Sequence, residues 1–304
     1  MVHWPTRSPF HFSFTRLQAR LLRNKFRRSG LKQQVVQVAN GDLSCWVGGD
    51  GPPLLLLHGF GASALWQFHP QVRALSKHHR LVIPDLLYFG GSTSPKGSRS
   101  VSYQAETMCQ LMDALMIPKS SVLGLSYGGF VALWMIAQYP ERVDRLIISN
   151  SPGIGMNADD YQALLKTFQV SHPREVFLPE HPDGIRTLMN IAWHRPPPLP
   201  GFALRDAHRN LFYNQVADKK ELLNELVGHL EAPSLHSDVY DHACTRVLIL
   251  WGAHDKVFPV HLAHRMHRAL NGKGTLEVFS RSAHAPNLER PRRFNHAILS
   301  FLAH

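Results

Sequence analysis

A strand pattern and a helix pattern meet at one serine in the stretch Val122-Leu123-Gly124-Leu125-Ser126-Tyr127-Gly128-Gly129-Phe130. The apolar run over residues 121–125 predicts a short buried strand, and the apolar periodicity over residues 127–139 predicts a helix. The pattern Gly-x-Ser-x-Gly suits a sharp strand-to-helix turn, because the neighbours of the strained serine must lack side-chain bulk. Such a turn points the hydroxyl out of the sheet, beside a helix N-terminus that stabilises negative charge. The stretch therefore predicts a nucleophile, Ser126, if the chain also supplies a base and an acid.

Strand and helix patterns alternate on both sides of this turn. Strands are predicted at residues 32–39, 43–47, 54–57, 81–84, 121–125, 143–149, 246–252 and 275–279, with a two-residue hairpin signal at Asn40-Gly41. Helices are predicted at residues 66–77, 103–116, 127–139, 261–270 and 292–302. The alternation indicates an α/β fold with a mostly parallel sheet and helices on both faces.

The alternation is interrupted once, which predicts an inserted domain. Residues 153–240 contain helical patterns at 159–169 and 219–230 and a proline cluster around residues 196–200, but no strand runs. We interpret residues 153–240 as a helical cap inserted into one α/β core, which comprises residues 33–152 and 241–304. Residues 1–32 form a separate basic N-terminal segment.

The net charge of +11 comes from this N-terminal segment. Residues 1–32 contain no acidic residue and eight basic ones, namely Arg7, Arg16, Arg20, Arg23, Lys25, Arg27, Arg28 and Lys32. The rest of the chain is near charge balance, which argues against a nucleic-acid-binding domain.

The N-terminal segment also has helical periodicity from Phe14 onward. Phe14, Leu17 and Leu21 share one side of the predicted helix, and Arg16, Arg20, Arg23 and Arg27 share the other. A basic amphipathic helix suits an anionic membrane surface, an organelle transit sequence or an arm that docks on the body of the protein. The residues leave all three interpretations open.

Several sequence features bear on location. No apolar run approaches the roughly 20 residues that span a bilayer, so no transmembrane helix is predicted. Cys45, Cys109 and Cys244 are odd in number and widely separated, which favours buried or free thiols in a reducing compartment. We therefore expect an intracellular protein that is cytoplasmic or peripheral to a membrane, with organelle targeting by the N-terminal segment left open.

Two loops after late strands supply the acid and the base. A serine at such an elbow is followed in chain order by its acid and then its histidine. Asp255 follows the strand at 246–252, and His284 follows the strand at 275–279. Asn150 occupies the other position where an acid is sometimes found, which leaves Asp255. His254 is the nearest rival to His284 as the base, but it lies directly beside the acid.

The oxyanion hole is predicted to combine two backbone N–H groups. One is that of Tyr127, directly after the nucleophile, and the other comes from the loop after the strand at 54–57. That loop reads His58-Gly59-Phe60-Gly61, and the N–H of Phe60 is predicted as the donor, with that of Gly61 as the alternative.

The chain resembles the α/β-hydrolase fold superfamily from about residue 30 to its end. The resemblance rests on His58-Gly59-Phe60-Gly61-Ala62-Ser63, Pro84-Asp85-Leu86-Leu87-Tyr88-Phe89-Gly90-Gly91-Ser92, the serine elbow, Trp251-Gly252-x-x-Asp255 and Ala283-His284. It is most similar to capped serine esterases and lipases, particularly plant-type monoacylglycerol-lipase-like members. Gly91 departs from that subgroup, which often has an acidic residue there. The resemblance implies hydrolysis of carboxylic esters through an acyl-enzyme, without a metal or an organic cofactor.

The expected substrate is a small-molecule apolar ester, with acylglycerols among the candidates. Trp66, Phe130, Val257 and Phe258 flank the predicted site in the sequence and are the predicted pocket residues. Two alternatives share the serine triad: a hormone-receptor-like protein with slow turnover, and a C–C bond hydrolase. Peripheral membrane contact through residues 1–32 is a further expectation, and oligomeric state is not predicted.

Three histidines share helical spacing near the predicted acid. They are His261, His264 and His267. No carboxylate or cysteine converges on them in the sequence, so we expect a solvated helix face and not a metal site.

Overall fold

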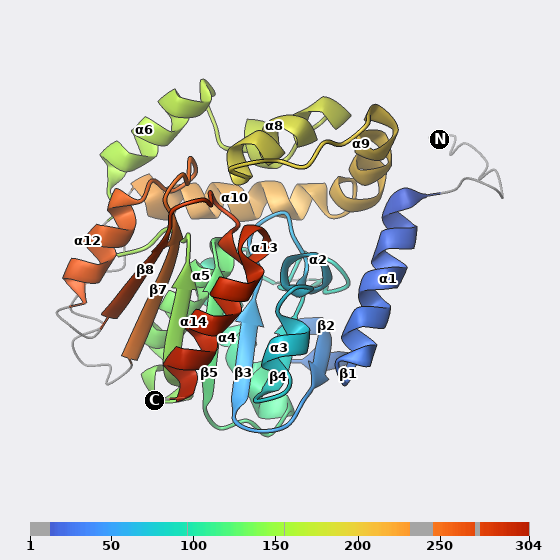
Figure 1. Ribbon diagram of the computed structural model, residues 1–304, viewed down its shortest axis with the longest axis vertical. Helices are drawn as coiled ribbons and strands as arrows, with labels where there is room; N and C mark the ends of the chain where they lie inside the picture. Colours follow the sequence, from blue (N-terminus) through green and yellow to red (C-terminus); the bar gives the residue numbers. More distant parts are fainter. Residues whose placement is uncertain (1–12, 96, 155, 232–245, 271–273, 304) are drawn as a thin grey trace.

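The structure, a computed structural model, describes residues 13–95, 97–154, 156–231, 246–270 and 274–303. In this part of the chain, eight strands form one sheet in the order β1-β2-β4-β3-β5-β6-β7-β8 (Figure 1). Only the pairings of β1 with β2 and of β2 with β4 are antiparallel. The strands are β1 (Leu31–Val38), β2 (Gly41–Gly48), β3 (Pro53–Leu57), β4 (Arg80–Pro84), β5 (Ser120–Leu125), β6 (Val143–Ser149), β7 (Arg246–Gly252) and β8 (Gly274–Phe279). The predicted mostly parallel sheet is confirmed.

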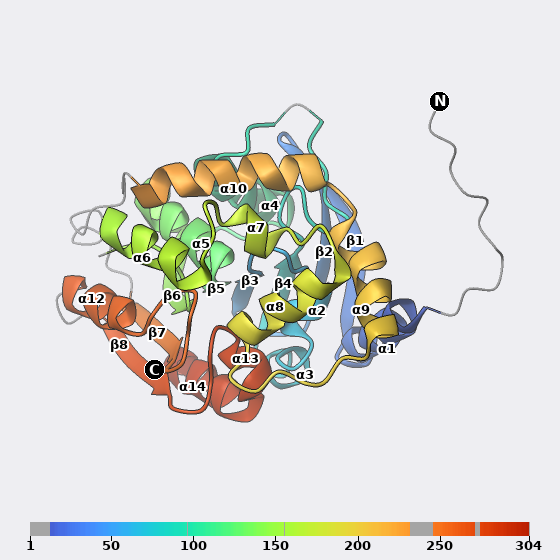
Figure 2. The same ribbon diagram turned by 90° about the horizontal axis from the view of Figure 1, so that it is seen from above.

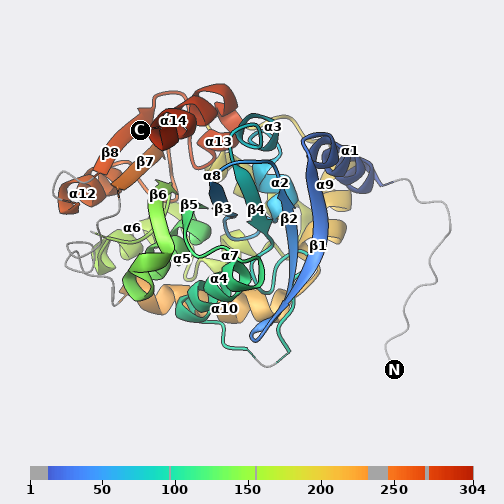
Figure 3. The same cartoon turned by 90° about the horizontal axis from the view of Figure 1, so that it is seen from below.

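Helices cover both faces of this sheet, as Figure 3 shows from below. Strand β3 explains why two layers are needed, because its four leucines are all buried and alternate between the faces. Leu55 and Leu57 belong to the core cluster on one face, and Leu54 and Leu56 to the cluster on the other. The first face is covered by α4 (Val101–Ala114), α5 (Tyr127–Gln138) and α12 (His261–Ala269), and the second by α1 (Phe14–Arg28), α2 (Ala64–Phe68), α3 (Val72–Leu75) and α14 (Pro291–Ala303).

A further layer of helices lies over one edge of the sheet, at the ends of the parallel strands (Figures 1 and 2). Its elements are α6 (Ala158–Phe168), α7 (Arg174–Phe177), α8 (Pro182–Ala192), α9 (Gly201–Ala207), the π-helical turn η2 (His208–Phe212) and α10 (Val216–Glu231). These helices all fall within residues 153–240, the segment predicted to be the cap. Residues 232–245 lie outside the described residues. The short elements η1 (Pro140–Arg142) and α13 (Pro286–Glu289) complete the fold.

The structure corrects two local predictions. The single helix predicted over residues 66–77 is two short helices, α2 and α3. Pro70 lies between them and has no N–H to donate to the preceding turn, so the helix cannot continue through it. The predicted hairpin forms, but Val38 pairs with Gly41, so its two turn residues are Ala39 and Asn40 and not Asn40 and Gly41.

Helix α1 docks on the body through a side that the sequence pattern did not identify. Its buried residues are Thr15, Ala19, Leu22 and Phe26, and the Phe26 ring lies 4.9 Å from that of Trp46. The predicted apolar side instead faces solvent, with Phe14, Leu17 and Leu21 exposed by 40%, 43% and 60%. The helix is therefore fixed to the sheet by one stripe and presents a second apolar stripe outward.

The first turn of α1 is held by the cap. The carboxylate of Asp206, at the end of α9, accepts hydrogen bonds from the backbone N–H of Thr15 at 2.6 Å and from the Ser13 hydroxyl at 3.0 Å. Burial favours a higher pKa for Asp206, but these hydrogen bonds outweigh it and the pKa is lowered. An anion at a helix N-terminus is also stabilised by the helix dipole.

Two expectations about location can be compared with the described residues. None of the helices in these ranges is both long enough and apolar enough to cross a bilayer. Cys45 and Cys109 are buried free thiols, and Cys244 lies outside the described residues.

The two apolar stripes of α1 give a direct test of how this helix is fixed. Phe26→Ala removes a wholly buried ring and is expected to lower the free energy of unfolding by about 3–5 kcal/mol. Leu21→Ala, on the exposed stripe, is expected to change it by less than about 0.5 kcal/mol. Urea denaturation of both variants measures the difference. Equal costs for the two substitutions would contradict the docking of α1 through Phe26.

Candidate active site

The serine of the elbow has the backbone conformation that its flanking glycines predict. Ser126 lies between β5 and α5 at φ 52° and ψ −120°, which a residue with a side chain rarely adopts. A Cβ on Gly124 would lie 2.5 Å from the Cα of Gly129, and one on Gly128 would lie 2.6 Å from the carbonyl oxygen of His58. Only glycine fits at either position, because both contacts are with backbone atoms that cannot move aside.

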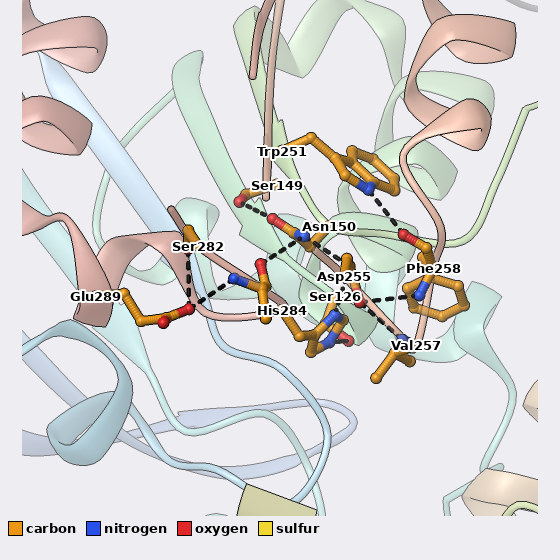
Figure 4. Close-up of polar contacts among 11 residues, drawn as sticks. Ser126, Ser149, Asn150, Trp251, Asp255, Val257, Phe258, Ser282, His284 and Glu289 are labelled. Atoms are coloured by element: carbon orange, nitrogen blue, oxygen red, sulfur yellow. Dashed lines mark hydrogen bonds and ion pairs between the residues drawn. The ribbon is translucent and has the colours of Figure 1, made fainter. Parts of the chain in front are cut away.

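The structure brings the predicted triad into one hydrogen-bonded chain (Figure 4). Nε2 of His284 lies 3.0 Å from Oγ of Ser126, and Nδ1 of His284 lies 2.9 Å from Oδ2 of Asp255. The three residues are separated in the sequence but follow the ends of β5, β7 and β8, which meet at one edge of the sheet. The Asp255 side chain is completely buried, whereas that of His284 is 14% exposed.

The hydrogen bonds of Asp255 fix the tautomer of His284. Oδ1 of Asp255 accepts from the backbone N–H groups of Val257 at 2.8 Å and Phe258 at 3.1 Å. Oδ2 accepts from Nδ2 of Asn150 at 2.6 Å, besides its contact with His284. These three donors use carboxylate lone pairs, and Oδ2 also faces Nδ1 of His284 as an acceptor. Nδ1 of His284 therefore carries a proton, and Nε2 presents a lone pair to the Ser126 hydroxyl.

Asn150 is a residue whose contribution the sequence did not reveal. In the sequence, Asn150 indicated only that no acid stands at that position. In the structure, its Nδ2 donates to Asp255 and, at 3.3 Å, to the carbonyl of Ala283, next to His284. Its own amide oxygen accepts from the Ser149 hydroxyl at 3.0 Å, and its backbone is left-handed at φ 47°. Asparagine tolerates that conformation better than most residues, and the combination orients the acid and the histidine loop together.

Glu289 is a second residue that the sequence did not single out. Oε1 of this carboxylate accepts from the Ser282 hydroxyl at 2.9 Å and the backbone N–H of Ala283 at 2.7 Å. Oε2 accepts from the backbone N–H of His194, just after cap helix α8, at 2.9 Å. The N–H of His284 itself donates to the carbonyl of Ala192 at 3.0 Å. The loop that carries His284 is thus joined directly to the cap.

The loop after β3 is shaped by a buried histidine. Nε2 of His58 accepts the backbone N–H of Leu86 at 2.9 Å, so Nδ1 must carry the proton that it shares with the Gly59 carbonyl at 2.8 Å. Burial lowers the pKa of His58, which keeps the ring in this neutral form. In a trans peptide the C=O and the next N–H point in opposite directions. Holding the Gly59 carbonyl toward His58 therefore turns the N–H of Phe60 away from it.

The two N–H groups predicted as oxyanion donors belong to Phe60 in this loop and to Tyr127 at the start of α5. Gly59 lies against the nucleophile, since a Cβ built on it would be 3.2 Å from the Cβ of Ser126. Neither the N–H of Phe60 nor that of Tyr127 donates to a backbone carbonyl in the turns and loops of the described residues. The assignment of these two N–H groups as oxyanion donors remains a prediction.

Comparison with known proteins agrees with this geometry. Residues 52–171 match the family described as alpha/beta hydrolase fold. The chain is 27% identical over 268 residues to the monoacylglycerol lipase ABHD6 of Homo sapiens, which covers 84% of this chain and 76% of that protein. It is 26% identical over 265 residues to 2-hydroxy-6-oxo-2,4-heptadienoate hydrolase of Pseudomonas putida, with 84% and 90% covered. The fold superposes on a bacterial membrane phospholipase A with a TM-score of 0.80, at 24% identity over 95% of this chain and 91% of that one.

The protein has the α/β-hydrolase fold. The proteins to which it is similar include both lipases or esterases and C–C bond hydrolases, so the fold alone does not select between the two chemistries.

The four residues predicted to form the substrate pocket have different surroundings. Val257 and Phe258 hold Asp255 through their N–H groups, and the Phe258 ring lies 5.6 Å from that of His284. Phe130 is buried and packs against Trp134 and against His229 of cap helix α10. Trp66 lines a cavity whose lining residues include neither Ser126 nor His284.

His254, the rival of His284 as the base, and Asp85, in the loop after β4, both have partners outside the proposed triad. His254 points its Nε2 at the carbonyl of Ser280, at 2.9 Å, and stacks on His194. Asp85 accepts from the backbone N–H groups of Ala64 and Gly91, at 2.8 and 3.0 Å, so its carboxylate joins the start of α2 to its own loop.

Two of the three histidines of α12 make separate side-chain contacts. Nε2 of His261 lies 3.3 Å from Oδ1 of Asp160, and Nε2 of His267 lies 3.1 Å from the Gly274 carbonyl. Within the described ranges, no group of three or more His, Cys, Asp or Glu side chains is placed to hold a metal ion.

The space around two glycines, Gly128 in the elbow and Gly228 in α10, predicts opposite effects of substitution on stability. Gly128→Ala places a methyl group against the backbone of His58 and is expected to destabilise the fold by about 1–3 kcal/mol or more. Gly228→Ala, on an open face of α10 with nothing within 4 Å, is expected to stabilise it by about 0.5–1 kcal/mol. Thermal unfolding of the two variants provides the test. A Gly128→Ala protein as stable as the wild type would contradict the close packing of the elbow.

Proposed function

We propose that the protein is a serine hydrolase that cleaves carboxylic esters with an apolar acyl group through an acyl-enzyme intermediate. The observation that carries the proposal is the hydrogen-bonded chain from Ser126 through His284 to Asp255, with distances of 3.0 and 2.9 Å. A hydroxyl bonded to the free lone pair of an oriented imidazole is an activated nucleophile.

Acylation follows from this geometry. Oγ of Ser126 attacks the ester carbonyl carbon, and its proton passes to Nε2 of His284. Asp255 stabilises the resulting imidazolium through Nδ1–H. The N–H groups of Phe60 and Tyr127 stabilise the oxyanion, a contribution of about 3 kcal/mol for each donor. The carbon–alkoxide bond then breaks, and the proton on His284 is transferred to the leaving alcohol.

Deacylation repeats the same steps with water. His284 removes a proton from a water molecule, whose oxygen attacks the acyl carbon. The bond to Oγ of Ser126 breaks, the carboxylic acid leaves, and Oγ regains a proton from His284. Asn150 acts as a positioning residue in both halves, because it holds the acid and the loop of the base in one arrangement.

An aromatic cluster beside the oxyanion loop supports an apolar acyl group. The Phe60 ring makes edge-to-face contacts with Phe89, Tyr127 and, from the cap, Phe177, at centroid distances of 5.4, 6.2 and 6.5 Å. Phe177 in turn contacts Phe168 of α6 at 6.4 Å. Apolar surfaces with few polar groups are typical of sites for lipid-like ligands. The lipase among the relatives is consistent with such a substrate.

A second candidate is hydrolysis of a C–C bond in a 2-hydroxy-6-oxo-dienoate. The named hydrolase of Pseudomonas putida favours it, since this chain covers 90% of that protein. The proposed nucleophile and base are the same in both reactions, so the substrate alone separates them.

A panel of acyl esters, acylglycerols and a 2-hydroxy-6-oxo-dienoate tests the function. We expect repeated turnover of the esters, and a loss of kcat/KM of roughly 10⁴-fold or more in Ser126→Ala and His284→Asn. His254→Asn is the matched control and should retain ester hydrolysis, because His254 points away from Ser126. Ester hydrolysis that survives in Ser126→Ala would disprove the proposal, and turnover of only the dienoate would establish the second candidate.

We further propose that α1 contacts an anionic membrane surface. The helix contains six Lys/Arg and no acidic residue, and its outer stripe exposes Phe14, Leu17 and Leu21. Lys25 and Arg28 fall within the same helical arc as this stripe. Exposed apolar side chains flanked by cations suit the boundary between headgroups and acyl chains of an anionic membrane.

Point substitutions test this contact better than removal of residues 1–32, which would also remove the buried Phe26. We expect the double variant Leu17→Glu/Leu21→Glu to lose at least about tenfold in binding to phosphatidylserine vesicles, because two apolar side chains no longer enter the membrane. Vesicle sedimentation measures the binding. Met116→Glu, at an exposed apolar residue elsewhere, is the control and should bind as the wild type does. Unchanged sedimentation of the double variant would rule out this contact.

A further inference from the structure

A cavity of about 560 Å³ lies between α1, the oxyanion loop and the start of cap helix α10. Arg16, Ala19 and Arg23 line it from α1, and residues 61–63 line it from the loop that also carries Phe60. This volume falls in the range of roughly 300–1,000 Å³ that is typical of small-molecule sites. This cavity is not used in the proposed ester hydrolysis, because neither Ser126 nor His284 lines it.

Cations predominate in its lining. Arg16, Arg23 and Lys219 contribute three positive charges, and Asp85 contributes the one carboxylate among the lining residues. Both oxygens of Asp85 already accept backbone N–H groups, those of Ala64 and Gly91. With Asp85 counted, the three cations still give the lining a net positive charge, which favours an anionic ligand.

Lys219 is the most unusual of these cations. Its side chain is only 6% exposed, and its Nζ donates one hydrogen bond, to the carbonyl of Asn214 at 2.8 Å. In the part of the chain that the structure describes, it forms no ion pair within 4.0 Å. Burial lowers its pKa, and the nearby charge of Asp218 offsets only part of this effect. An ammonium group has three donors, so Lys219 retains the capacity to bind an anionic group.

The rest of the cavity wall combines apolar residues with uncharged polar ones. Its apolar residues are Ala19, Trp46, Ala62, Leu65, Trp66, Leu211 and Leu288. Indole and leucine side chains provide surface for a hydrocarbon chain and give no further partner for a charge. A small hydrophilic anion would use the cations but leave this surface without a contact.

We propose that this cavity binds an anionic amphiphile, whose carboxylate or phosphate head pairs with Lys219 and whose hydrocarbon tail lies against the apolar wall. This site is additional to the proposed ester site and does not require that Ser126 be reactive. Because the cavity is lined by both α1 and the oxyanion loop, a bound amphiphile touches two parts of the protein that are far apart in the sequence.

Isothermal titration of the full-length protein tests the chemistry of the ligand. Dodecanoate and dodecyl phosphate serve as amphiphilic anions, dodecanol as the neutral tail, and inorganic phosphate as the free anion. We expect saturable binding of at least one amphiphilic anion, at least tenfold tighter than that of dodecanol or inorganic phosphate. Dodecanol binding as tightly as dodecanoate would overturn the role of the head. Phosphate binding as tightly as dodecyl phosphate would overturn the role of the tail.

Two matched pairs of variants place the ligand in this cavity. Lys219→Met keeps the length of the side chain and is expected to weaken binding of the amphiphilic anion at least tenfold. Lys220→Met, at the adjacent exposed lysine, should leave it unchanged. Arg23→Gln should weaken binding several-fold, whereas Arg20→Gln, on the same helix but outside the lining, should not.

The folding of the Lys219 variant is checked by its Tm. We expect a Tm at or above that of the wild type, because the substitution removes a buried charge that has no counter-ion. Wild-type affinity in a folded Lys219→Met protein would overturn the site, even if ester hydrolysis by Ser126 were established. Loss of ester hydrolysis in Ser126→Ala with unchanged dodecanoate binding would leave both assignments intact.

Discussion

The backbone strain at Ser126 is the constraint on which the site depends. A residue with a side chain held at φ 52° and ψ −120° costs on the order of 1–3 kcal/mol, and it persists only when its surroundings leave it no alternative. Here the N–H of Ser126 is bonded to the carbonyl of Ser149 on the neighbouring strand, and two later N–H groups of α5 bond to its carbonyl. The buried centre of the sheet thus provides the stability that keeps the hydroxyl pointing out of the fold.

The other parts of the site are arranged around this fixed point. The parallel strands β5, β7 and β8 end at one edge, so loops remote in sequence bring Asp255 and His284 to Ser126. Glu289 and the carbonyl of Ala192 then connect the His284 loop to the cap. A displacement of α8 would therefore change the position of His284, the proposed base.

Much of this could be predicted from the sequence. Strand runs, the elbow and the order serine, acid, histidine are local patterns, and each reflects backbone preferences or burial along a few residues. The predictions that were wrong concern local interruptions, such as Pro70 within the helix expected at 66–77. Asn150 was missed because its partner Asp255 lies over 100 residues away in the sequence. Glu289 was missed because its partners belong to two separate segments, the His284 loop and the end of α8.

The sequence by itself determined the α/β order of the elements, the inserted helical segment and the three residues of the proposed triad, which the structure joins by hydrogen bonds. Periodicity and glycine spacing are sufficient for these, because they act between near neighbours in the chain. Only the tertiary structure decided which stripe of α1 is buried, since Phe26 and Leu21 are both apolar and only the position of Trp46 distinguishes them. It also placed Lys219 in a cavity beside the oxyanion loop, because a cavity is formed by elements that meet in space and leaves no periodic pattern in any one of them.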